Sequence, residues 1–218
     1  MHKFLLSRRA LLGTGGAALL LPDTAASAKS ANWRALGEDV RNEMRWAWRN
    51  YREYAWGKDQ IKPISGGNES FPLKNHHLGL SLIEALDTLW IMGFDAEFRD
   101  GIDWMKANLD FDVDGEVSVF ETSIRLVGGL LSAHHCSGDP VLLAKAKDLA
   151  DRLLPSFNAS PLGIPHRYIN LRTGALRGPI TNPAETGTFI RLSKTIPKHR
   201  GKHAARRPPL IIRSVTDR

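Results

Sequence analysis

Glu121 and Arg125 stand four residues apart in the stretch 119–133, which has the spacing of an amphipathic helix. Its apolar residues recur about one turn apart, at Phe120, Ile124, Val127 and Leu131. A second stripe, one residue further along, begins with Glu121 and Arg125 and ends with the small residues Gly128 and Ser132. The spacing therefore predicts a buried helix with one acid and one base on the same side, which suits a catalytic carboxylate. The plainer interpretation is a surface ion pair worth about 0.2–0.5 kcal/mol.

A second pair of acids, Glu84 and Asp87, lies in the otherwise apolar run 78–92. Carboxylates among so many apolar neighbours need partners or a polar cavity, because burying an unpaired charge is costly. We therefore expect both side chains to face a cavity, and the alternative is a solvated stripe on a helix.

Several blocks of the sequence, taken in order, resemble glycoside hydrolase family 47, the class I α-1,2-mannosidases, whose members trim mannose from N-linked high-mannose glycans. The resemblance runs from about Asn42 to Glu185, and the order of the blocks is more specific than any single block. The blocks are Trp48 to Ser65, Leu78 to Gly93, Val117 to Asp139, Asp151 to Phe157, Gly163 to Pro165 and Ala184-Glu185.

Members of this family fold as a barrel of seven helical hairpins, (α/α)7, with the active site in the lumen. They require calcium and hydrolyse with inversion, which needs two carboxyl groups about 6.5–9.5 Å apart, one to protonate the leaving oxygen and one to activate water. The resemblance therefore implies an all-α fold, the N-terminal portion of such a barrel, incomplete in this chain.

The resemblance also assigns roles to five residues. Glu121 falls on the Glu of the family motif F-E-[ST]-[ST]-I-R and is the candidate catalytic acid, while Arg125 falls on its Arg, a substrate contact. Glu84 and Asp87 match the acidic pair of a D-[AS]-L-D-T block, and we expect them to face the same lumen. Glu185 matches a further family acid, so these last three join Arg125 as candidate substrate-binding residues.

The later hairpins of the family carry its second catalytic carboxylates and the threonine that binds calcium, and no motif of this chain matches them. We therefore expect no metal site here, although the family cofactor is Ca²⁺. Fourteen helices with their connections need about 250 residues, whereas residues 29–190 number 162. The prediction is that 29–190 form only part of the barrel, and that the chain as written does not turn over substrate.

The basic charge of the chain lies in its last residues. The whole chain has a net charge of +7, but residues 191–218 hold nine Lys and Arg and one acid, so the remainder carries about −1. This tail lacks a helical or strand period, and the pattern changes inside a family motif. We interpret it as an unstructured segment translated out of frame. The alternative is a native tail that binds nucleic acid or an anionic surface.

The N-terminus predicts export. Arg8 and Arg9 precede the apolar run 10–21, and Ala26-Ser27-Ala28 supplies a small-residue cleavage site, so residues 1–28 are predicted to be a signal peptide. Ser7-Arg8-Arg9 resembles a twin-arginine signal, which implies a bacterial protein that is periplasmic or secreted. The apolar run has 12 residues, short of the ~20 that span a bilayer, so we expect no stable membrane span.

The rest of the pattern is helical. Helices are predicted at 33–56, 78–92, 96–108, 119–135 and 140–154, with loops at 61–75 and 155–183, where prolines interrupt the chain. The first helix is predicted to present one face through Trp33, Val40, Met44, Ala47, Tyr51 and Tyr54.

Two functions from different classes follow. By resemblance, the first is a calcium-dependent, inverting exo-α-1,2-mannosidase that acts on high-mannose oligosaccharides, with Glu121 as proton donor and Arg125 positioning it. The alternative is a non-catalytic module that binds mannose glycans through the same acids and arginine. A third outcome is a chain that does not fold stably. We expect a monomer whose partner is a mannose-containing oligosaccharide, with no nucleic-acid partner.

Overall fold

The computed structural model describes residues 31–161, 163–180 and 182–192. The predicted export signal at 1–28 and nearly all of the predicted basic tail at 191–218 lie outside these ranges, so both stay predictions. The chain divides into two compact units between Val40 and Arg41, inside the first helix. The described part of the first unit is therefore the beginning of that helix.

Helix α1 spans Trp33–Ala55. In the first unit, the Asn32 side-chain oxygen accepts a hydrogen bond from the Ala35 amide at 3.1 Å, as an N-terminal cap does. In the second unit, α1 buries Trp48, Tyr51 and Ala55, which follow the i, i+3, i+7 spacing of one face. Of the predicted face, Tyr51 is buried and Met44 partly buried, but Ala47 and Tyr54 are exposed, so the prediction was only partly right.

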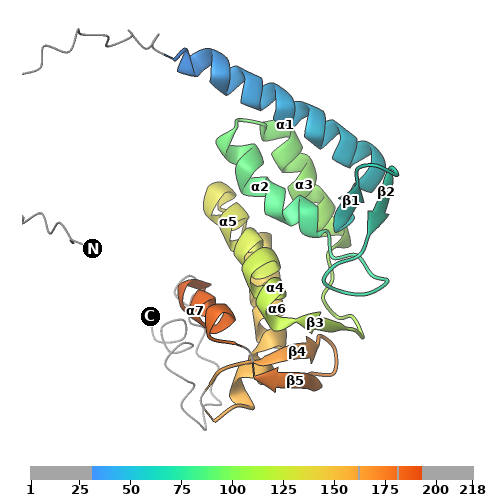
Figure 1. The fold of residues 1–218 in the computed structure, drawn as a ribbon, viewed down its shortest axis with the longest axis vertical. Helices are drawn as coiled ribbons and strands as arrows, with labels where there is room; N and C mark the ends of the chain where they lie inside the picture. The colour runs from blue at the N-terminus through green and yellow to red at the C-terminus, as the bar shows by residue number, and fades with distance from the viewer. Residues whose placement is uncertain (1–30, 162, 181, 193–218) are drawn as a thin grey trace, which may run out of the picture. The chain divides into compact units, whose positions relative to one another are not determined.

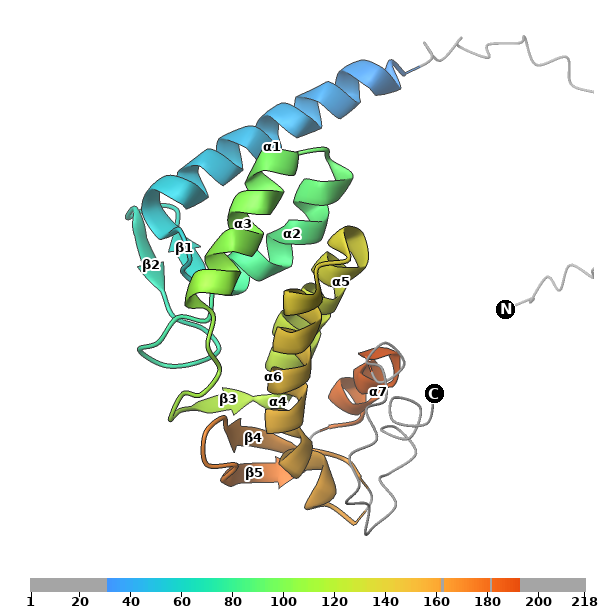
Figure 2. The same cartoon turned by 180° about the vertical axis from the view of Figure 1, so that it is seen from behind.

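The second unit is built on two pairs of antiparallel helices (Figure 1). Helix α2 (Leu80–Ile91) packs against α3 (Asp95–Asn108), and α5 (Gly128–Ser137) packs against α6 (Pro140–Asn158). Helix α2 also contacts α5, which joins the two pairs into one core, and Figure 2 shows the same arrangement from behind. Side chains that are almost fully buried come from all four helices, among them Leu82, Leu86, Leu89, Met105, Leu130, Leu142 and Leu149.

A hairpin and a loop connect α1 to α2. Strand β1 (Gln60–Lys62) pairs antiparallel with β2 (Gly67–Glu69). Gly57 and Gly79, one on each side of the hairpin, both have positive φ and both lie against the ring of Trp104 in α3. A Cβ at Gly79 would stand 2.7 Å from a Trp104 ring carbon, so only glycine fits at this contact.

A three-stranded antiparallel sheet lies at one end of the second helix pair (Figure 1). It has the order β3 (Glu116–Ser118), β4 (His166–Asn170) and β5 (Leu176–Ile180), with Val117 opposite Ile169 and Tyr168 opposite Arg177. Strand β3 runs directly into α4 (Val119–Glu121), and Val117, Val119 and Ile169 are buried. The sheet therefore fixes the start of the helix that carries Glu121.

The segment 155–183 differs from the predicted loop. Helix α6 continues through Pro155 to Asn158, where the Ala159 amide bonds to the Pro155 carbonyl at 3.1 Å and the Ser156 hydroxyl to the Leu153 carbonyl at 2.7 Å. Pro155 has no amide hydrogen to donate, but its carbonyl still accepts a hydrogen bond, so the last turn closes after it. Strands β4 and β5 follow, and helix α7 (Pro183–Leu192) begins where the loop was predicted to end.

The predicted helix 119–135 is present, but it is not a uniform α-helix. The π-helical turn η2 (Thr122–Val127) separates α4 from α5, and the Gly128 amide bonds to the Ser123 carbonyl five residues earlier. None of the helices in the described ranges is both long and apolar enough to cross a membrane.

Candidate active site

Glu121 ends the short helix α4, one residue before the π-helical turn. Ser118 caps this helix, because its hydroxyl oxygen accepts a hydrogen bond from the Glu121 amide at 3.3 Å. The Glu121 side chain is 28% exposed, so its carboxylate is half-buried and still accessible to a ligand.

Arg125 holds two of the predicted acids. Its Nε donates to Glu121 Oε2 at 2.6 Å, and its Nη1 donates to Glu84 Oε1 at 3.1 Å and to Oε2 at 3.3 Å. The hydrogen bond to Glu121 is the main influence that raises the pKa of Arg125, so this guanidinium stays charged. The Phe71 ring also lies 5.9 Å from the Arg125 Cζ atom, within cation–π range. Arg125 therefore has a fixed position between three neighbours.

The second predicted acid on α2, Asp87, points to a different partner. Its Oδ2 accepts a hydrogen bond from the Ser132 hydroxyl of α5 at 2.8 Å. Burial, and to a lesser extent Asp87, raises the pKa of the Cys136 thiol on the same helix. On helix α2, the Glu84 carboxylate thus binds Arg125, and the Asp87 carboxylate, about one turn later, binds α5.

The π-helical turn carries Arg125 and lies between α4 and the close contact of α2 with α5. The Ser123 hydroxyl donates to the Val119 carbonyl at 2.6 Å, while the buried Thr122 hydroxyl oxygen has no hydrogen-bond partner among the described residues. π-Helical turns are rare and occur frequently at functional sites. The helix is therefore wider at the turn from which the Arg125 side chain extends.

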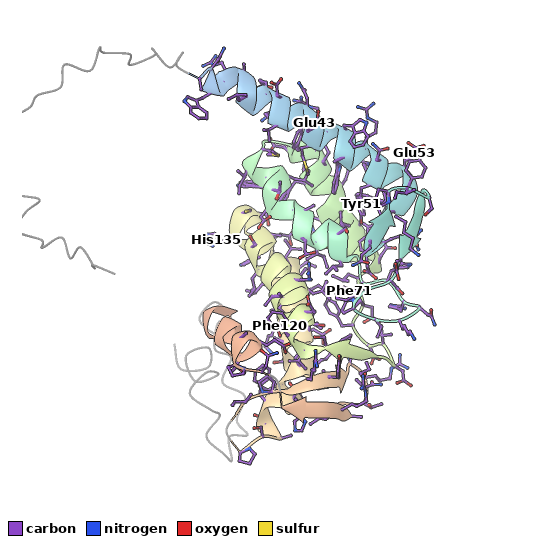
Figure 3. The ribbon with its side chains drawn as sticks, viewed as in Figure 1. Glu43, Tyr51, Glu53, Phe71, Phe120 and His135 are labelled. Atoms are coloured by element: carbon purple, nitrogen blue, oxygen red, sulfur yellow. The ribbon has the colours of Figure 1, made fainter. Side chains whose placement is uncertain are left out.

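A cavity of about 470 Å³ lies beside Glu121. Phe71, on the segment between β2 and α2, and Phe120, on α4, both line it (Figure 3). The charged and polar side chains in its wall include Glu121 and Glu185 together with Lys74, Glu116, Ser118, Arg167 and Tyr168. Glu84, Asp87 and Arg125 do not line this cavity. Of the five predicted residues, Glu121 and Glu185 therefore line the cavity, the ion pairs of Arg125 join Glu121 to Glu84, and Asp87 stands apart with Ser132.

Glu185 has a second role at the start of α7. The Asn182 side chain accepts from the Glu185 amide at 3.0 Å and donates to Glu185 Oε1 at 2.8 Å. The Asn182 oxygen therefore caps the first turn of α7, while the Glu185 carboxylate binds the Asn182 side-chain amide and not its backbone amide, so the arrangement differs from a capping box. Glu185 thus reaches the cavity wall from a position that helix capping also stabilises.

The sheet supplies cavity residues that the sequence analysis missed. Arg177 binds Glu116 through its Nε at 2.6 Å, and this hydrogen bond lowers the pKa of Glu116. Arg167 and Arg177 lie 5.6 Å and 4.4 Å from the ring centre of Tyr168. The available signal was Gly174 between two runs of strand-forming residues, which favours a hairpin.

Three aspartates spaced two residues apart, Asp110, Asp112 and Asp114, precede Gly115 and Glu116 of the cavity wall in the sequence. Asp112 Oδ1 is held by Arg152 at 3.3 Å and by Arg172 at 3.2 Å, and Asp114 accepts from an Asn170 amide at 2.8 Å. Across the described ranges, no group of three or more His, Cys, Asp or Glu could hold a metal ion. These residues therefore do not fit a calcium site.

Known proteins resemble this chain in sequence and in fold. The sequence model of glycosyl hydrolase family 47 matches residues 43–195. The mannosyl-oligosaccharide 1,2-α-mannosidase MNS1 of Arabidopsis thaliana is 49% identical over 143 residues, which are 65% of this chain and 25% of that protein. The mannosyl-oligosaccharide 1,2-α-mannosidase IB of Mus musculus is 45% identical over 141 residues, 64% of this chain and 22% of that protein.

The solved structure of an α-1,2-mannosidase from Trichoderma reesei is also similar, with a TM-score of 0.65 and 26% sequence identity. The match covers 73% of this chain and 36% of that one. The predicted fold class, part of an all-helical hairpin barrel, is confirmed by this likeness. The chain spans about a quarter of the length of the curated relatives it matches.

Proposed function

The chain belongs to glycosyl hydrolase family 47, and from that premise we propose that it carries one side of an α-1,2-mannosidase site for mannose-containing oligosaccharides. The observation that supports this most directly is Glu121, a half-buried carboxylate oriented by Arg125 at the wall of a cavity that Glu185 shares. The named relatives are mannosyl-oligosaccharide 1,2-α-mannosidases, and the proposed substrate class is taken from their names.

We assign Glu121 the role of proton donor to the leaving oxygen. Arg125 orients Glu121 through the 2.6 Å hydrogen bond, and Glu84 on α2 binds Arg125 in turn. We assign Glu185, which lines the same cavity, the role of accepting hydrogen bonds from sugar hydroxyls. Asp87, which is bonded to Ser132 instead, supports the helix pair in this proposal.

Inversion and calcium dependence are the finer parts of the proposal. An inverting reaction requires a second carboxyl group about 6.5–9.5 Å from the acid, on the far side of a bound water. Calcium is proposed as the cofactor by family membership, although no group of three or more His, Cys, Asp or Glu in the described ranges could hold a metal ion. No step of the reaction is therefore assigned to calcium here.

The test is mannose release from α-1,2-mannobiose by the full chain, with added calcium and with chelator. Release by the native sequence that is lost in Glu121→Gln and kept in Glu43→Gln supports the enzyme. Glu43 is a suitable control because it is exposed on α1, away from the cavity (Figure 3). Such release would also show that the expectation of no turnover was wrong.

The alternative, a non-catalytic mannose-glycan binding module, has its own support. Aromatic side chains interleaved with a few polar groups are typical of ligand pockets, and Phe71, Phe120 and Tyr168 line this cavity with Glu121 and Arg167. Binding of mannobiose by calorimetry without release, weakened in Arg167→Ala, would support the module. Neither binding nor release in a folded chain would refute both functions.

We also propose that the protein is exported by a bacterial cell and acts in the periplasm or outside the cell. This rests on the twin-arginine-like sequence at Arg8 and Arg9 and the small-residue cleavage site before residue 29.

A further inference from the structure

Asp59 is a fully buried carboxylate that the sequence analysis did not single out. It lies between α1 and β1, and its carboxylate accepts hydrogen bonds from three backbone amides and lies within hydrogen-bond distance of a histidine ring nitrogen. A charge taken out of water is costly unless it is fully hydrogen-bonded, so this arrangement needs a structural or functional reason. The cavity beside Glu121 does not include Asp59.

The two oxygens of Asp59 bind opposite ends of the segment 71–80. Oδ2 accepts from the Phe71 amide at 3.1 Å and lies 3.2 Å from His77 Nδ1. Oδ1 accepts from the Leu78 amide at 2.8 Å and from the Leu80 amide at 2.9 Å. One carboxylate therefore sets where this segment begins and where it enters α2.

Both ends of that segment lead to Arg125. Phe71 places its ring 5.9 Å from the Arg125 Cζ atom. Leu80 is the first residue of α2, and Glu84, about one turn later, accepts from Arg125 Nη1 at 3.1 Å. Of the three groups that hold Arg125, Asp59 thus fixes two, and the third is Glu121 itself.

We propose that Asp59 is a positioning residue for the candidate active site, acting through Phe71 and the start of α2 to hold Arg125 against Glu121. This inference rests on the proposed function for its meaning in catalysis, but the contacts that carry it are independent of turnover. Asparagine has nearly the same shape and only one acceptor oxygen, so Asp59→Asn can satisfy the amides at one end of the segment but not at both.

The experiment follows the Nε–Hε signals of arginines in the full chain, labelled with ¹⁵N. The Arg125 signal is assigned by its loss in Arg125→Lys. Arg152 provides an internal control, because its Nε donates to Asp148 at 3.0 Å, outside the Asp59 contacts. A hydrogen-bonded Hε exchanges slowly with water, and its exchange rate reports local opening.

In Asp59→Asn we expect Hε exchange of Arg125 to accelerate about tenfold or more while that of Arg152 stays unchanged. A general loss of stability would accelerate both signals, and that result would overturn the proposal. An unchanged Arg125 signal in a folded Asp59→Asn protein would overturn it equally.

If Asp59→Asn does not fold, Phe71→Leu decides the question, because it keeps the amide bound by Asp59 and removes the ring beside Arg125. Faster exchange of Arg125 alone supports the proposal, and no change refutes it. The measurement needs no substrate, so a chain that releases no mannose still tests the positioning role.

Discussion

The contact of α5 with α2 predicts opposite effects for two adjacent glycines. A Cβ on Gly129 would lie 2.7 Å from Ile83 Cγ2 and 3.2 Å from the Ile83 carbonyl oxygen, well inside the ~3.5–4.0 Å at which carbon atoms attract. Because one of these atoms is backbone, α2 itself must shift. Overpacking costs about 1–3 kcal/mol, and alanine regains up to about 1 kcal/mol of helix propensity. We expect Gly129→Ala to lower the free energy of unfolding by up to about 2 kcal/mol.

Gly128→Ala is the matched control. Its Cβ would meet only the Ser123 carbonyl oxygen, at 3.7 Å, which is an ordinary contact. The same gain in helix propensity therefore acts without a clash, and we expect Gly128→Ala to raise the free energy of unfolding by up to about 1 kcal/mol.

Urea unfolding of the full chain, followed by tryptophan fluorescence, measures both variants, provided that their m values agree. Adding Ile83→Ala identifies the contact, because truncating Ile83 should cost less stability in the Gly129→Ala background than in the native one. If Gly129→Ala is as stable as Gly128→Ala, or if Ile83→Ala costs the same in both backgrounds, the helix contact does not have the geometry described.

Two further predictions concern acid stability and export. The hydrogen bond from Lys106 lowers the pKa of Asp139, so the carboxylate adds stability above the ordinary aspartate pKa of about 4, and this is lost as the pH falls through the lowered value. Asp139→Asn should therefore be less stable in urea at pH 7, with the gap closing toward pH 2, and a gap independent of pH would contradict this. Mass spectrometry should find exported protein that begins after Ala28, and changing both Arg8 and Arg9 to lysine should keep the precursor in the cytoplasm; normal export of that variant would argue against a twin-arginine signal.

Local patterns predicted the helices up to α6, because each is recorded in the spacing of its own apolar residues, but they did not predict α7. The pairing of Glu121 with Arg125 is of the same kind, since one helical turn joins them. The buried face of α1 was harder to predict, because Trp33, Val40 and Tyr54 are apolar or aromatic yet exposed. Only the partner surface decides which aromatic residues of such a helix are buried.

The rest of the candidate site depends on contacts between distant residues. Asp59 gives no local signal, because its partners are backbone amides 12 to 21 residues away. Backbone amides occur at almost every position of any sequence, so nothing in the residue types marks these. The π-helical turn changes one hydrogen-bond step without changing the apolar pattern around it. Glu116 and Tyr168 reach the cavity only after β3 pairs with β4, and β4 lies in the segment 155–183, whose prolines indicated a loop.

The indole of Trp104 lies against both Gly57 and Gly79, and this contact affects how the length of the connection 58–78 can vary. Both ends of the connection between them are anchored at one side chain, so the chain in between closes a loop whose entropy cost rises by only about 0.6 kcal/mol when its length doubles. The tip of the hairpin, where Ile64 is fully exposed, contributes nothing to that anchor. We therefore expect residues to be inserted or removed at this tip while Phe71 and the start of α2 keep their places.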